Sequence, residues 1–252
     1  MSLEGNIEYA LTRVQSQYGS RPDMSEWRRL EASHDLGQYL EGTRSSIFGP
    51  WVSSLDRNRD AHAIERTLRG AWRSYVRTVA AWHPRRWQPW LTWLEWLPTL
   101  GLIDRLERAG PVPAWLLADP ILGPVARGTS AERSVAVKGT ALAVFEPAIA
   151  GRVPLAELWL ARWRELRPQV DAFTEQLLAA VRRTVQEHAR MLTREGADAV
   201  ALRNQLRERL STLFRAAAGT VVATLCHLAL MALDFERLRG GLVNRSLFAR
   251  GK

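Results

Sequence analysis

Two pairs of residues in the chain have types and spacings that could do chemistry. His62 and Glu65 are three positions apart, and residues at that spacing on a helix can share a metal ion in helical bundles. Such sites need matching ligands on other helices, and His34, His83 and His188 form no second pair of this kind. A solvated pair on a helix surface is therefore the favoured interpretation, and no metal site is predicted.

The second pair is Cys226 and His227, which are adjacent in the sequence. Neighbours on a helix point about 100° apart, so a Cys–His nucleophile is not expected and a buried thiol is. Cys226 is the sole cysteine, which excludes an internal disulfide and a cysteine-based zinc site. Phosphate-binding glycine loops and a Gly-x-Ser-x-Gly elbow are absent. We therefore predict a protein that is not an enzyme and has no cofactor; an enzyme acting through His62, Glu65 or Cys226 is the lesser alternative.

Tryptophan is unusually abundant, with 11 residues, five of them between positions 82 and 96. Together with Arg85 and Arg86, this run could stack bases and neutralise phosphates. The favoured alternative is core packing, with Trp90 in a buried stripe and arginine stems covering the rings. A protein-binding surface is the third interpretation, because Trp and Arg are enriched at interface hot spots.

The composition sets limits on the class of protein. The chain has 252 residues, 46% of them hydrophobic, which is enough for a core and excludes disorder. All but two of the 35 basic residues are arginine, and the net charge is +9. This charge predicts acidic partners such as acidic protein surfaces or nucleic acid, although compositional bias would also produce it. One cysteine and the lack of a signal pattern at Met1–Asn6 predict a cytoplasmic protein.

Helical periodicity dominates the sequence and predicts an all-α fold, with a bundle or a funnel of helices. Apolar residues recur every three or four positions over 61–82, from Pro168 to near Gly196, and over 198–215. Asp23 with Glu26, and Thr129 with Glu132, have the spacing of a capping box, which marks a helix start.

Prolines gather between residues 83 and 128, where only short helices and turns are expected. We interpret this stretch as a Pro/Trp-rich connection between an N-terminal helical half, 1–82, and a C-terminal one, 129–252. From Ala216 to Leu233 no residue carries a formal charge. Small and polar residues dilute this segment, so a buried central helix is favoured over a membrane span.

Three motifs near the N-terminus then suggest a family. Tyr9 is followed four residues later by Arg13; the run from Asp35 through Leu36, Tyr39 and Leu40 to Thr43 precedes the aromatic Phe48; and Ile64, Glu65 and Leu68 open a long helix. In this order the motifs resemble the C (or d) subunit of V-type and A-type rotary ATPases. The match is best over residues 6–96. A weaker match follows at 233–248, where Glu236 stands in place of the family's Asn.

The resemblance implies a non-catalytic, funnel-shaped helical subunit that links the central shaft of the ATPase to the membrane rotor ring. It would sit peripherally at the cytoplasmic face of the membrane, with shaft and rotor-ring subunits as partners. The expected partner-contacting residues combine the motif positions with the Arg–Trp run; they are Tyr9, Arg13, Asp35, Tyr39, Glu65, Arg85, Arg86 and Trp90. The alternatives are a basic helical protein that binds nucleic acid through the Arg–Trp run, and a helical scaffold or adaptor.

Overall fold

The computed structural model describes residues 7–107 and 112–249. Within these ranges all regular secondary structure is helical, which confirms the predicted all-α fold. Met1–Asn6, on which the lack of a signal pattern was argued, lie outside the described residues. The described chain contains no helix that is both long enough and apolar enough to cross a membrane.

The chain divides into two compact units, the first made of residues 1–91 and 168–252 and the second of residues 92–167. These bounds differ from the expected division at 83 and 129, because the last third of the chain packs with the first third. The helices that lie in the first unit are α1 (Ile7–Gly19), α2 (Met24–Glu31), α3 (Leu36–Arg44), α4 (Gly49–Val52), α5 (Ala61–Ala81), a 3-10 helix at Arg85–Trp87, α6 (Gln88–Thr92, whose last residue belongs to the second unit), α12 (Ala172–Leu192), α13 (Ala199–Ala216) and α14 (Val221–Ala249).

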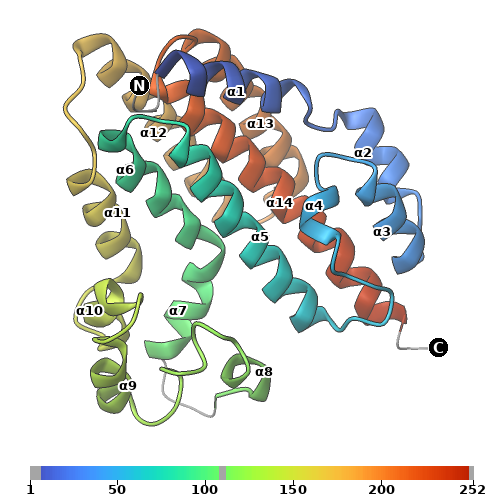
Figure 1. Cartoon of the computed structure of the whole chain (residues 1–252), viewed down its shortest axis with the longest axis vertical. Helices are drawn as coiled ribbons and strands as arrows, with labels where there is room; N and C mark the ends of the chain where they lie inside the picture. The colour runs from blue at the N-terminus through green and yellow to red at the C-terminus, as the bar shows by residue number, and fades with distance from the viewer. Residues whose placement is uncertain (1–6, 108–111, 250–252) are drawn as a thin grey trace, which may run out of the picture. The chain divides into compact units, whose positions relative to one another are not determined.

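The long helix α14 is the centre of the first unit (Figure 1). It packs against α13, α5, α1, α3 and α12. The predicted buried helix at 216–233 is thereby confirmed, with a shift of its start. Residues between Ala216 and Val221 form a turn, in which Gly219 has a φ of +85° that an L side chain rarely adopts. The helix then continues well past Leu233, because its charged second half finds partners on α2, α3 and α5.

The other predicted helices form close to their expected bounds. Asp60, Asp171 and Asp198 each cap a helix, the side chain accepting hydrogen bonds from the first free backbone amides of α5, α12 and α13. Both predicted capping boxes are present, at Asp23 and at Thr129. These caps satisfy amides that a helix leaves unpaired at its start, and the two capping boxes were the helix starts predicted from such polar motifs.

The second unit consists of short helices. Its elements are a 3-10 helix at Trp93–Thr99, α7 (Leu100–Glu107), α8 (Ala114–Leu117), α9 (Ser130–Val137), a 3-10 helix at Ala143–Phe145, α10 (Glu146–Ile149) and α11 (Leu155–Glu165). The helix α10 packs against α7, α9 and α11. As expected of the proline-rich stretch, no helix described between 83 and 128 exceeds eight residues.

Aromatic rings form much of the core of the second unit. The ring of Trp93 stacks on Phe145 with centroids 5.4 Å apart and on Trp159 with centroids 6.4 Å apart. Trp96 meets the same Phe145 edge-on. The Nε1 of Trp93 donates a hydrogen bond to the carbonyl of Trp159, so its polar atom is satisfied inside the core.

Candidate functional site

The candidate site is a groove between α1 and α5 in the first unit, which we call the α1–α5 groove. Its volume is about 330 Å³. Gln17 borders it from α1, and Tyr75, Thr78 and Trp82 border it from α5 and its C-cap. Trp51 of α4 also lines it. The groove therefore combines aromatic rings with polar side chains at its edges, as binding surfaces for other molecules do.

The guanidinium of Arg13 lies against two aromatic rings at the end of this groove. The guanidinium carbon of Arg13 lies 5.1 Å from the ring centre of Trp82 and 5.7 Å from that of Tyr9. Tyr9 is 52% exposed and Arg13 is also exposed. Because Arg13 and Gln17 are four residues apart, they lie on one face of α1. This face continues from the cluster of Tyr9, Arg13 and Trp82 into the groove.

The inner faces of the same two helices explain why the outer faces are free. Ala10 and Val14 of α1 are buried, as are Ile64, Leu68 and Val79 of α5. In an amphipathic helix of this kind the apolar stripe packs in the core and the more polar side faces solvent.

Tyr75 connects the groove to the core. Its hydroxyl is 2.7 Å from Nε2 of His227, a fully buried residue of α14. Burial raises the pKa of Tyr75 above its usual value and lowers the pKa of His227 to about 3, the nearby Arg21 acting in the same direction on His227. The histidine is therefore neutral at physiological pH, and the pair is a hydrogen bond between two neutral groups.

Of the expected partner-contacting residues, Tyr9 and Arg13 are the ones placed at the groove. Tyr39 is 1% exposed, and burial raises the pKa of its hydroxyl to about 12. Its ring lies 4.0 Å from the guanidinium carbon of Arg245. Tyr39 therefore packs α3 against α14, and its side chain is buried where a partner contact was expected.

Asp35 and Glu65 also have internal roles. Asp35 caps α3 by accepting a hydrogen bond from the amide of Gln38. Glu65 is paired with Arg69 at 3.4 Å and with Arg239 of α14 at 3.3 Å. Asp35 thus caps its own helix, and Glu65 links α5 to α14.

The Arg–Trp run separates into buried rings and exposed charges. Trp90 is fully buried and Trp87 is 6% exposed, so both rings pack in the core, and Trp90 is buried where a partner contact was expected. Arg85 and Arg86 are exposed, and Arg86 lies over the ring of Trp87 at 5.8 Å. Since the rings face inward, bases have no aromatic surface to stack on at Trp87 or Trp90.

The residues considered for catalysis are not assembled into a site. Cys226 is buried, and desolvation raises the pKa of its thiol to about 12. His62 is exposed, and Glu65 is engaged with arginines. No group of three or more His, Cys, Asp or Glu residues in the described part of the chain could hold a metal ion.

Sequence reasoning missed Trp82 as a half-buried residue of the groove and missed Trp51 and Gln17 altogether. Trp82 is the last residue of the apolar stripe over 61–82, and a residue at the end of such a stripe is often only partly buried. Tyr9, Arg13 and Gln17 at intervals of four were a usable signal for one face of α1.

Comparison of the chain with known proteins found no match among protein families, curated proteins or solved structures.

Proposed function

We propose that this protein is a non-catalytic coupling subunit of a V-type or A-type rotary ATPase, and that it binds a partner subunit through the α1–α5 groove. Support comes from the spatial relation of the motifs on which the resemblance rests. Glu65 of the N-terminal motifs pairs with Arg239 of the C-terminal one, 174 positions away. Two motifs that lie far apart in the sequence are thus in direct contact in the folded protein.

The C-terminal motif, residues 233–248, also contacts α2. Arg237 donates two hydrogen bonds of 2.6 Å to the carboxylate of Glu31, and its guanidinium carbon lies 4.9 Å from the ring centre of Trp27. Arg245 donates to the carbonyls of Glu31 and Ser33 at the end of α2. A two-pronged Arg–carboxylate pair resists shear between helices. A helical body joined in this way suits the transmission of force.

The Tyr9, Arg13 and Trp82 cluster supports a protein partner. Tyrosine, tryptophan and arginine are the side chains that contribute most to protein interfaces. Arg13 makes no ion pair with any residue in the described ranges, so its charge is available to an acidic surface. The arginine is already ordered by the two rings, which lowers the entropy lost when a partner binds.

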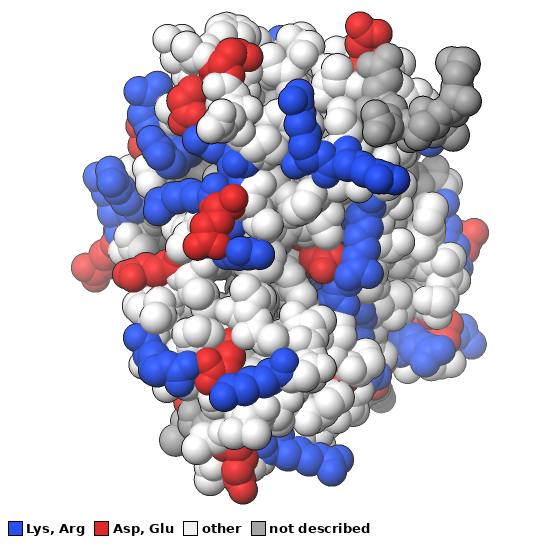
Figure 2. Space-filling model, turned by 60° about the vertical axis from the view of Figure 1, so that its left-hand side comes forward, with Lys and Arg blue, Asp and Glu red and all other residues white. Residues whose placement is uncertain are grey.

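No observation favours nucleic acid to the same degree. On the face drawn in Figure 2, acidic side chains lie among the basic ones, and no continuous basic patch forms. A nucleic-acid surface that follows a phosphate backbone is expected to be continuously basic.

The test is a tagged pull-down from gently solubilised membranes, with bound proteins identified by mass spectrometry. We expect shaft and rotor-ring subunits to be recovered at moderate salt. Recovery of nucleic acid or of unrelated proteins in their place would contradict the proposal.

Variants of the groove test the assigned surface. Tyr9→Ala is expected to weaken binding of the purified shaft subunit about 30-fold, the effect of losing a hot spot of ~2 kcal/mol. Phe173→Ala is the matched control, because Phe173 is an aromatic residue of the same unit with a similar exposure of 57%. If both variants bind as the wild type does, the coupling role stands and the groove is not its surface.

A further inference from the structure

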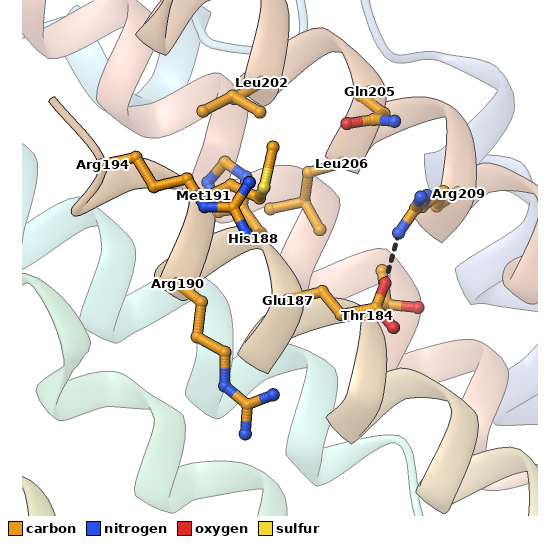
Figure 3. A pocket seen from close by; sticks show the side chains of 10 residues that line it. All are labelled: Thr184, Glu187, His188, Arg190, Met191, Arg194, Leu202, Gln205, Leu206 and Arg209. Carbon is orange, nitrogen blue, oxygen red and sulfur yellow. Dashed lines mark hydrogen bonds and ion pairs between the residues drawn. The ribbon is translucent and has the colours of Figure 1, made fainter. Parts of the chain in front are cut away.

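A second cleft lies between the helices α12 and α13, which form a helical hairpin in the first unit (Figure 3). Its volume is about 300 Å³. The cleft is separate from the α1–α5 groove and shares no residue with it. It involves none of the residues on which the resemblance rests.

The lining has an apolar part and a charged part. Met191 of α12 and Leu202 and Leu206 of α13 supply apolar surface, with Leu206 buried and the other two half-buried. His188 lies beside them and is half-buried (Figure 3). Burial, and secondarily the charge of Arg203, lowers the pKa of His188 below its usual value, so the ring is neutral near pH 7.

Basic side chains exceed acidic ones around the cleft. Arg190, Arg194 and Arg209 line it, against the single carboxylate of Glu187. Arg209 donates to Glu187 at 2.6 Å. Figure 3 shows this pair on one side of the cleft and Arg194 on the other, extending toward Met191 and His188, while Arg190 points away.

The side chain of Arg194 differs from that of Arg209, which is engaged with Glu187. The Arg194 guanidinium makes no ion pair or hydrogen bond with any residue in the ranges that the structure describes. A guanidinium beside a neutral imidazole and an apolar surface offers a fork of donors that matches the oxygens of a phosphate or carboxylate.

We propose that this cleft binds a small organic anion, a phosphate or carboxylate attached to an apolar group about the size of one aromatic ring. The anionic group lies between Arg194 and Arg209, and the apolar group covers Met191, Leu202 and Leu206. The volume of the cleft is at the lower end of the range for small-molecule sites, which limits the ligand to this size. The proposal does not depend on the coupling function.

The test is a titration of the full-length protein followed by the NMR signals of the histidine rings. The chain has five histidines, and the signal of His188 is identified by its loss in His188→Gln. The probes are phenyl phosphate, benzoate, inorganic phosphate and phenol. We expect phenyl phosphate or benzoate to shift the His188 signal to saturation, and the tighter of the two identifies the anionic group.

The remaining probes separate the two parts of the site. Inorganic phosphate is expected to bind at least about tenfold more weakly than phenyl phosphate, because it buries no apolar area. Phenol is expected to leave the signal in place, because it has no charge for Arg194. A His188 signal that none of the anions moves up to about 10 mM would overturn the proposal.

Paired variants exclude general attraction to a basic protein. Arg194→Gln is expected to weaken binding about tenfold or more, the effect of one charge-assisted hydrogen bond. Arg182→Gln removes the same charge from an exposed position of α12 that does not line the cleft, and binding should be unchanged. Equal weakening by both variants would show that no specific site exists.

Discussion

The two halves of α14 contrast in what holds them inside the first unit. From Val221 to Met231 every side chain except Ala229 is buried, and none carries a formal charge. From Asp234 to Arg245 the helix carries charged residues whose partners lie on α2, α5, α13 and the turn after α1. One helix thus relies on apolar packing at its start and on ion pairs and hydrogen bonds toward its end.

Two buried polar side chains of the first half, Thr224 and His227, are neutral and form hydrogen bonds with neutral groups outside α14. Thr224 lies 3.0 Å from Nε2 of His83, and His227 lies 2.7 Å from the hydroxyl of Tyr75. In the second half, Asp234 is fully buried between Arg21 and Arg207, each at 2.7 Å. The contrast shows two ways of burying polar groups: removing the charge, or pairing it.

The largest effect is expected from Asp234→Ala. The change leaves Arg21 and Arg207 without their shared carboxylate while their side chains stay only 8% and 16% exposed. Breaking a buried ion pair from one side costs about 3–5 kcal/mol, which urea unfolding would measure. A loss below about 1 kcal/mol would mean that water reaches the two arginines.

Lowering the pH should destabilise the protein through the two histidines at the first half of α14. Burial lowers the pKa of His83 to about 4 and that of His227 to about 3, while an unfolded histidine titrates near pH 6.5, so unfolding takes up protons below that pH. Stability is retained above about pH 6.5 and falls as the pH decreases toward the folded values, by about 1.4 kcal/mol per pH unit for each histidine.

The contribution of one histidine can be isolated by substitution. In His227→Gln the slope of stability against pH between about 6 and 5 should be smaller by about 1.4 kcal/mol per pH unit. Unfolding followed at several pH values measures this slope. An unchanged slope would indicate that His227 is protonated in the folded protein.

Two neighbouring glycines in the second half should respond in opposite directions. A Cβ at Gly241 would lie 2.7 Å from Cζ of the buried Tyr39, whereas a Cβ at Gly240 meets nothing within 4 Å. Gly241→Ala should therefore destabilise the protein by about 1–3 kcal/mol through overpacking. Gly240→Ala should stabilise it by up to about 1 kcal/mol through helix propensity. Thermal unfolding of both variants gives the comparison, and equal shifts would contradict the close contact with Tyr39.

The smallest effect is expected from Glu236→Ala, two residues after Asp234. Glu236 pairs with Arg239 at 3.0 Å, but both side chains are at least 40% exposed. An exposed pair of this kind contributes about 0–1 kcal/mol. Urea unfolding of Glu236→Ala and Asp234→Ala then shows how much of the loss in the free energy of unfolding depends on the burial of the Arg–carboxylate pair. A loss as large as that of Asp234→Ala would remove the distinction.

Some of the fold was readable from the sequence because its signals are local. The starts of α5, α12 and α13 follow from a single capping aspartate before an apolar period, and both capping boxes are contacts over three residues. Periodicity was less informative about exposure. Phe173, Val181 and Val185 of α12 recur at helical spacing in the sequence, yet of these three only Val181 is buried. A stripe identifies an apolar face but does not say how far a neighbouring helix covers it.

The candidate sites were less predictable than the helices. Tyr9 and Arg13 stood out as a pair, but Trp82, which completes their cluster, comes from another helix. The cleft of Arg194 and Arg209 needs α12 and α13 to lie side by side, which no single segment encodes.

The sequence by itself determined the all-helical class, the caps and the buried character of the uncharged segment in α14, since each depends on residues within a few turns of one another. Only the tertiary structure decided that Asp234 meets Arg21 across 213 positions, that Tyr39 faces inward, and that the half-buried Trp82 borders the α1–α5 groove. A helix has several faces of similar composition, and the face that becomes buried depends on which distant helix packs against it.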